Sequence, residues 1–181
     1  MLSPGVATTL RYMATLLSYC QWLGDTSFSI GIRESTWIYP VIESVHVLSL
    51  CVFVGLLLLW DLRLVGITLR RVAVSEVWSW LIPWITLGAV LMVVSGVLLF
   101  VSDPVKFYGN IFFRIKAFGL FLALINAIIF HLGVERRLPE WDTAAVTPRG
   151  ARVAGAVSIG LWAVIVVTGR LVAYNWFPPL V

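Results

Sequence analysis

The sequence predicts an all-α integral membrane protein: a four-helix bundle with antiparallel neighbours, preceded by an N-terminal interfacial amphipathic helix. Three observations support this fold class. Of the 181 residues, 60% are hydrophobic and 12% are charged, whereas soluble domains average about 45–50% and about 25%. Four apolar stretches each reach the roughly 20 residues that cross a bilayer. None alternates with a period of two, and backbone groups in lipid must bond internally, which leaves helices.

The first 35 residues differ from the rest of the chain. The segment LRYMATLLSYCQWLG places apolar and polar groups at helical spacing, which is typical of a helix that lies in the membrane interface. A flexible arm is the alternative. A signal peptide is not expected, because Arg11 interrupts the apolar run.

The four spans are expected at residues 37–60, 78–101, 111–134 and 152–174 of one domain, 1–181. Asp61 and Arg63 are expected to end the first span, Asp103-Pro104 the second, and Glu135 to Arg137 the third. The loops between spans are short, roughly 10–17 residues, so neighbouring helices should be antiparallel. Cys20 and Cys51 are expected to be free and buried, because two cysteines form no disulfide framework.

The distribution of cations predicts the orientation. The loops after the first and third spans carry Arg63, Arg70, Arg71, Arg136, Arg137, Arg149 and Arg152. Once cations within spans and in the surface helix are set aside, the other side retains Arg33, Lys106 and Arg114. The positive-inside rule then makes both termini periplasmic in a bacterial inner membrane. The net charge of +4 suits anionic membrane lipids, whereas the scattered arginines exclude nucleic acid as a partner.

Glu43 and His46 are ionisable residues within the first span. They lie three residues apart, about 60° around the helix axis, so both side chains are expected on one face. Ionisable groups inside a span are costly and mark functional sites. Glu-x-x-His is also the spacing that di-iron helix bundles use, so the pair predicts a metal site. The alternative is that Glu43 lies near the interface and His46 bonds to it.

His131, together with Asn126, forms a second candidate site on the third span. Counting 1.5 Å per residue from the span ends separates His46 and His131 by roughly 16 Å in depth, which argues against one haem ligated by both. A haem held by His46 alone remains an alternative to a metal ion. The alternative for His131 is an interfacial histidine bonded to a backbone carbonyl.

Cations gather near the same depth as Glu43 and His46. Arg114 and Lys116 begin the third span, and Arg170 and Tyr174 end the fourth. These residues are expected to pair with Glu43, or to bind an anion such as a lipid phosphate or a haem propionate. The alternative is that they snorkel to head groups.

The strings IRESTWIYPVIESVHVLSLCVFVGLLLLWDLRLVG, FRIKAFGLFLALINAIIFH and VTGRLVAY resemble an uncharacterised family of bacterial four-helix inner-membrane proteins. The resemblance covers most of residues 31–175 and implies no established activity. It rests on Trp37, Tyr39, Pro40, Glu43, His46, Asp61, Arg63, Asn126, His131, Gly169, Arg170 and Tyr174. The chain is more distantly similar to the membrane domain of copper-resistance D proteins, which are implicated in copper passage. Its three methionines depart from the methionine-rich pattern of copper handlers.

Three functions follow as hypotheses. The first is binding or passage of a transition metal, copper, at Glu43, His46 and Arg170. The second is electron transfer by haem b held by His46, with Arg170 or Lys116 at the propionates. The third is a non-catalytic subunit or scaffold, which would bind a membrane or periplasmic protein or a second copy of the chain. Enzyme activity is not expected, because the sequence carries no nucleophile constellation or phosphate loop.

Overall fold

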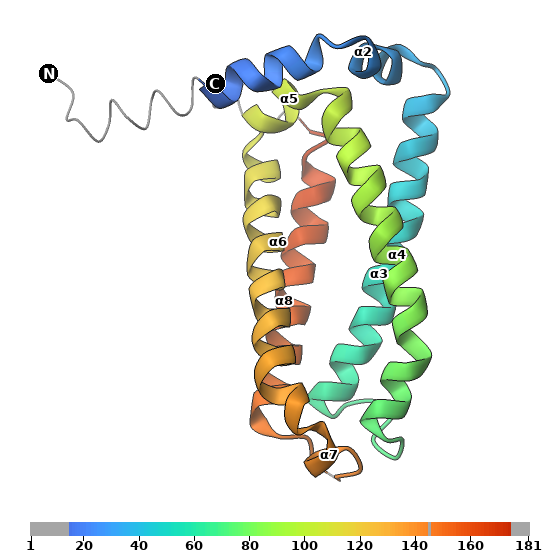
Figure 1. The fold of residues 1–181 in the computed structure, drawn as a ribbon, viewed down its shortest axis with the longest axis vertical. Coiled ribbons are helices and arrows are strands. Elements are labelled where there is room, and N and C mark those ends of the chain that lie inside the picture. Colours follow the sequence, from blue (N-terminus) through green and yellow to red (C-terminus); the bar gives the residue numbers. More distant parts are fainter. Residues whose placement is uncertain (1–14, 145, 175–181) are drawn as a thin grey trace, which may run out of the picture.

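The computed structural model describes residues 15–144 and 146–174, and every regular element in these ranges is helical. Four segments are long and apolar enough to cross a membrane, which confirms the all-α class and the number of spans. They are α3 (Ile38–Val65), α4 (Val74–Ser102), the continuous segment Ile111–Trp141 and α8 (Arg149–Leu171). Successive spans run in opposite directions, as predicted (Figure 1).

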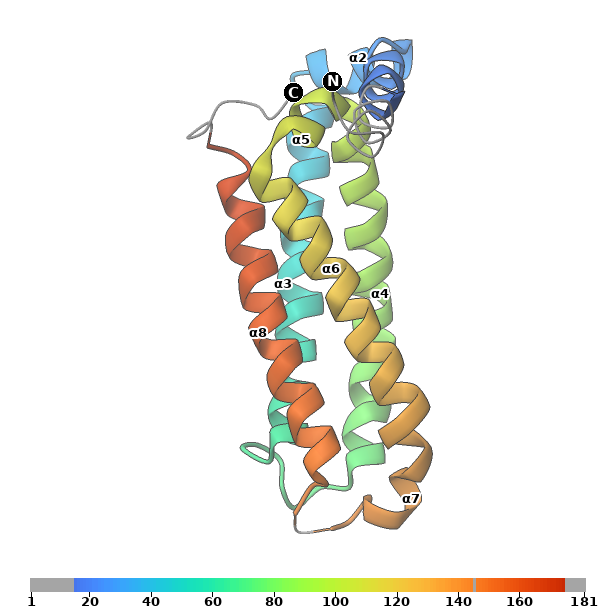
Figure 2. The same ribbon diagram turned by 90° about the vertical axis from the view of Figure 1, so that its left-hand side faces the viewer.

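The bundle consists of two helix pairs. α3 packs against α4, α6 (Ile111–Ile129) packs against α8, and α3 joins the pairs by packing on α8. Figure 2 shows α6 and α8 in front of α3 and α4. We call the end where α3 and α6 begin the α2 end, and the opposite end the α7 end.

The first span is longer than predicted, and the expectation that Asp61 and Arg63 end it is wrong. Both residues lie inside α3, where 4% of Asp61 and 2% of Arg63 is exposed. The helix accommodates Arg63 because its guanidinium donates to the Val72 carbonyl oxygen, with Nη2 at 2.8 Å. α3 ends at Gly66, whose φ of 87° allows the backbone N–H to bond back to the helix.

The third span also continues past its predicted end. After α6 the chain forms a π turn, η1 (Phe130–Val134), a 3₁₀ turn, η2 (Glu135–Arg137), and α7 (Leu138–Trp141). The charged run from Glu135 to Arg137 therefore changes the winding of the helix without ending it.

Small residues bring the helices close together. A Cβ atom added at Gly88 would lie 3.1 Å from the backbone nitrogen of Phe53, and one added at Gly155 would lie 2.9 Å from the carbonyl oxygen of Asp61. Glycine at these positions therefore allows α4 and α8 to approach the α3 backbone closely.

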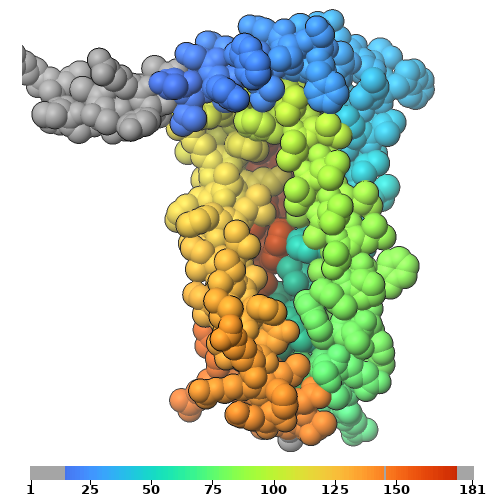
Figure 3. Space-filling view, in the orientation of Figure 1, coloured from blue at the N-terminus to red at the C-terminus, as the bar shows by residue number. Residues whose placement is uncertain are grey.

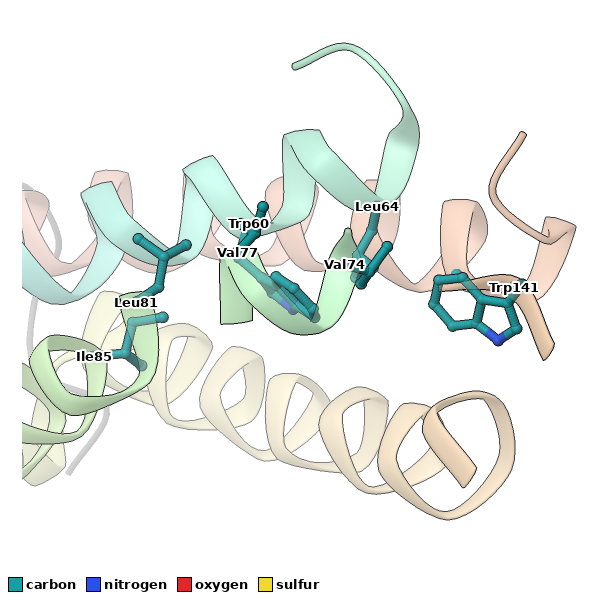
Figure 4. Close-up of a cluster of buried hydrophobic side chains, with 8 residues drawn as sticks. Trp60, Leu64, Val74, Val77, Leu81, Ile85 and Trp141 are labelled. Atoms are coloured by element: carbon teal, nitrogen blue, oxygen red, sulfur yellow. The ribbon is translucent and has the colours of Figure 1, made fainter. Parts of the chain in front are cut away.

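A hydrophobic cluster closes the α7 end. Figure 4 shows Trp60 and Leu64 of α3 beside Val74 and Val77 of α4, with Trp141 of α7 at the same end. The loop after α7 caps α4 as well: Asp142 accepts hydrogen bonds from the backbone N–H and the hydroxyl of Ser75, at 2.7 and 2.6 Å. These two donors hold the pKa of the Asp142 carboxyl below its usual range.

Two helical segments lie across the α2 end (Figure 1). Residues 15–24 are helical, and α2 (Ser27–Glu34) follows them. The Ser29 hydroxyl donates to the Val101 carbonyl oxygen at 2.6 Å, which attaches α2 to the C-terminal turn of α4. Residues 10–14 of the predicted amphipathic segment lie outside the described residues, and its place in the membrane interface stays a prediction.

Between α4 and α6 lies the short helix α5 (Pro104–Gly109).

Both cysteines are free, as expected, but Cys51 is exposed on α3 instead of buried.

Candidate functional site

His46 points from α3 into the seam with α4. Its Nδ1 lies 3.0 Å from the Ser95 hydroxyl oxygen. The ring packs directly on Gly96, where an added Cβ would lie 3.1 Å from the imidazole Cε1 atom. Glycine at position 96 therefore makes room for the imidazole between the two helices.

The hydrogen-bond network assigns the tautomer of His46. Ser95 donates its hydroxyl proton to the Leu91 carbonyl oxygen at 2.6 Å. Its oxygen must therefore accept the proton of the imidazole, which places the N–H on Nδ1. In the neutral ring the lone pair is then on Nε2, the atom that is available to a ligand.

Lys116 brings a positive charge to the same region. It extends from α6 toward α8, where its ammonium nitrogen lies 3.5 Å from the position of a Cβ added at Gly169. It is close enough to His46 for the two groups to interact electrostatically. Within residues 15–144 and 146–174, no carboxylate forms an ion pair with Lys116. We call His46, Ser95, Lys116 and Gly169 the His46–Lys116 centre, to which each span contributes one residue.

Glu43 lies apart from this centre. Its side chain is exposed, while His46 is half-buried against α4. A rotation of about 60° around α3 is enough to move a side chain from a helix seam to the outer surface. In the part of the chain that the structure describes, no three His, Cys, Asp or Glu residues are grouped to hold a metal ion. The two-residue metal site at Glu43 and His46 stays a prediction.

The two arginines of the predicted cluster contact tyrosines. The Arg114 guanidinium lies 5.0 Å from the Tyr108 ring centre, and its Nε donates to the Tyr108 carbonyl oxygen at 3.0 Å. Arg170 is exposed and lies 5.8 Å from the ring centre of Tyr174. The ion pairs among the described residues do not include Arg170 and Glu43, and anion binding by Arg170 stays a prediction.

Asn126 and His131 have different partners, and the second site predicted at these residues stays a prediction. The Asn126 amide donates to the Ala154 carbonyl oxygen of α8 at 3.0 Å. His131 is exposed and pairs with Glu135, one turn further along the same helical segment. Its partner is therefore a carboxylate, and not the backbone carbonyl that the alternative interpretation of His131 predicted.

His131 also lines a groove of about 400 Å³ with Trp60 and Trp78. Trp60 lies 14 residues beyond His46, about 21 Å along α3. The two histidines therefore lie at different depths, in agreement with the argument from the sequence against a shared haem.

A second polar group surrounds Asp61 in the half of the bundle nearer the α7 end. The buried Asp61 carboxyl is hydrogen-bonded to the Ser158 side chain of α8. Asp61, Ser158 and Asn126 line a cavity of about 300 Å³ between α3, α6 and α8. Sequence reasoning used Asp61 as a boundary marker and missed this cavity. The apolar residues Leu62, Leu64 and Val65 after Asp61 were the available sign that the span continues.

The surface between α4 and α6 is hollowed along the bundle. Figure 3 shows a furrow between these two helices, with atoms of α3 and α8 at its floor. The furrow follows from the packing, because α3 and α8 form the central contact and α4 and α6 flank it.

Comparison with known proteins gives a family and no activity. Neither the curated proteins nor the solved structures include a match to this chain. A model described as a family of unknown function, DUF6644, matches residues 19–175, and it carries no link to copper-resistance D proteins. Because this match covers most of the chain, the protein belongs to the DUF6644 family of unknown function.

Proposed function

We propose that this multi-pass membrane protein binds an amphipathic ligand with an anionic head group at the His46–Lys116 centre, and that this ligand is haem b. The observation that carries the proposal is the contact between His46 Nδ1 and the Ser95 hydroxyl oxygen, from which we infer the tautomer. With Nδ1–H donated to Ser95, Nε2 carries the lone pair that an axial ligand of haem iron needs. When bound, haem b would supply one-electron redox chemistry.

The charge of Lys116 supports an anionic partner. An ammonium inside a span is costly without a counter-charge, and none of the described carboxylates pairs with Lys116. A haem propionate would supply that charge through a charge-assisted hydrogen bond. Gly96 and Gly169 leave room for the His46 and Lys116 side chains themselves.

Copper at the same centre has less support. Copper sites use several imidazole, thiolate or thioether ligands. His46 supplies one imidazole there, His131 lies at another depth, and Glu43 is exposed. A scaffold role would need neither the oriented imidazole nor an unpaired ammonium in the bundle.

The proposal places the protein in a bacterial inner membrane, with both termini in the periplasm. The arginine-rich loops lie at the α7 end of the bundle, and by the positive-inside rule they support this orientation. The His46–Lys116 centre would then lie in the periplasmic half of the bilayer. Reporter fusions at residues 68 and 110 test the orientation: a cytoplasmic signal is expected at the first and a periplasmic signal at the second.

Titration of the full-length protein in detergent with haemin tests the function. A saturable Soret band near one haem per chain is expected, with loss of the band in His46→Ala and weaker binding in Lys116→Met. His131→Ala is the matched control and should retain the band. Equal binding by His46→Ala and wild type would refute the proposal. If the protein instead binds stoichiometric copper in a His46-dependent way and binds no haem, the ligand is copper and the haem assignment is wrong.

A further inference from the structure

The cavity at Asp61 is separate from the His46–Lys116 centre. Asp61 lies 15 residues beyond His46, about 22 Å along α3. Its carboxyl is buried, with 4% of the residue exposed. The cavity it lines measures about 300 Å³, at the lower end of the range for ligand pockets.

No cation of the described chain neutralises Asp61. The ion pairs of residues 15–144 and 146–174 do not include it. Arg63, two residues further along α3, donates to the Val72 carbonyl oxygen. The hydrogen-bond partner of Asp61 is the neutral Ser158 side chain. A buried carboxyl without a counter-ion either takes up a proton or pairs with a cation, so a cation that enters the cavity would stabilise its ionised form.

The cavity walls suit an organic cation. Phe53, Phe130 and Trp162 line it, and the rings of Phe53 and Trp162 meet edge to face at 5.0 Å. Aromatic faces attract ammonium groups, most strongly where water is excluded. An inorganic cation such as calcium needs six to eight oxygen ligands, and the cavity offers Asp61, Ser158 and Asn126 as its oxygen-bearing side chains.

The cavity adjoins a groove at the surface of the bundle. Ala127 and Phe130 line both this cavity and the groove of about 400 Å³ that Trp60 and Trp78 border. Two of the wall residues are therefore common to both hollows, so the apolar part of a ligand in the cavity would face the groove.

We propose that the Asp61 cavity binds a small organic cation: a protonated or quaternary amine that carries an apolar or aromatic group. The carboxylate of Asp61 pairs with the ammonium, and the aromatic walls contact both the ammonium and the apolar group. This site is independent of the ligand at His46 and Lys116.

Calorimetric titration of the full-length protein in detergent with benzyltrimethylammonium tests the proposal. Its uncharged carbon analogue, neopentylbenzene, has the same shape and serves as the ligand control. Saturable binding of the cation is expected in the wild type, with an affinity at least about tenfold lower in Asp61→Asn, the factor expected for a lost charge-assisted contact. His46→Ala should bind the cation as the wild type does, which separates this result from the haem experiment.

A second variant keeps the carboxylate and fills the space. Ala123 lines the cavity, so Ala123→Leu should also weaken binding of the cation by at least about tenfold while Asp61 stays intact. This variant decides the question if Asp61→Asn does not fold. Wild-type affinity in either folded variant, or equal binding of neopentylbenzene and the cation, would overturn the proposal.

Discussion

Replacing Ser95 with alanine should remove the hydrogen bond that orients His46, with a measurable effect on both stability and ligand binding. The bond joins α3 to α4 at 3.0 Å, and 4% of Ser95 is exposed. Hydrogen bonds between helices within membranes contribute about 0.6 kcal/mol on average and about 1.7 kcal/mol at most. We expect the coupling between Ser95 and His46 to lie in this range.

A double-mutant cycle measures that coupling. The free energy of unfolding is determined in mixed micelles of a mild detergent and sodium dodecyl sulfate for wild type, Ser95→Ala, His46→Leu and the double variant. Ser44 offers the matched control, since its hydroxyl donates to the Pro40 carbonyl oxygen of its own helix and is exposed. Ser44→Ala should change the free energy of unfolding by less than about 0.5 kcal/mol.

The same variants connect stability to function. Loss of a hydrogen bond that orients a metal-ligating histidine typically weakens binding by about 10- to 100-fold, so Ser95→Ala should bind haemin more weakly by a factor in this range. Additive effects of Ser95→Ala and His46→Leu on stability would refute the assigned contact. Unchanged haemin affinity in Ser95→Ala would refute the role of the tautomer.

Two further predictions concern the packing of the bundle. Gly155→Ala should destabilise the protein by about 1–3 kcal/mol, because the added methyl group would lie 2.9 Å from the Asp61 carbonyl oxygen. Gly160→Ala, where an added Cβ meets nothing within 4 Å, is its control in thermal unfolding; equal effects would contradict the close approach of α8 to α3. Asp142→Asn should destabilise the protein by about 0.3–1 kcal/mol at neutral pH, because the amide keeps one acceptor oxygen for Ser75 but loses the second oxygen and the negative charge near the start of α4. Because Ser75 holds the folded-state pKa of Asp142 below its usual range, this contribution is complete above about pH 3.9 and is lost as the pH falls through the folded-state pKa. Unfolding measured against pH should therefore show the difference between Asp142→Asn and wild type disappearing in acid, and a constant difference would contradict the cap.

The ends of the spans show the limits of sequence reasoning. Asp61 and Arg63 look like the end of a span because charged groups avoid lipid. In the structure Ser158 of α8 bonds to Asp61, and the Val72 carbonyl oxygen accepts from Arg63. Those partners come from other parts of the chain, so composition along one helix contains no sign of them.

The candidate site residues likewise have partners that only the packing of the helices reveals. His46 is confirmed as a residue that turns into the bundle, and Lys116 lies close to it. Arg114 and Arg170 contact tyrosines instead. Residues three positions apart share a helix face only approximately, so Glu43 is exposed while His46 contacts α4.

The amino-acid sequence is sufficient to predict four membrane-spanning helices, because hydrocarbon requires long apolar segments whose backbone groups bond internally. It also identified His46 as a polar residue that has to find a partner. The tertiary structure decided which partner each polar group has: Ser95 for His46, Ser158 for Asp61 and Ala154 for Asn126. Successive side chains project about 100° apart around a helix axis. Which helix interface a given side chain enters therefore depends on how the helices pack. The close approaches at Gly88, Gly96 and Gly155 fix that packing.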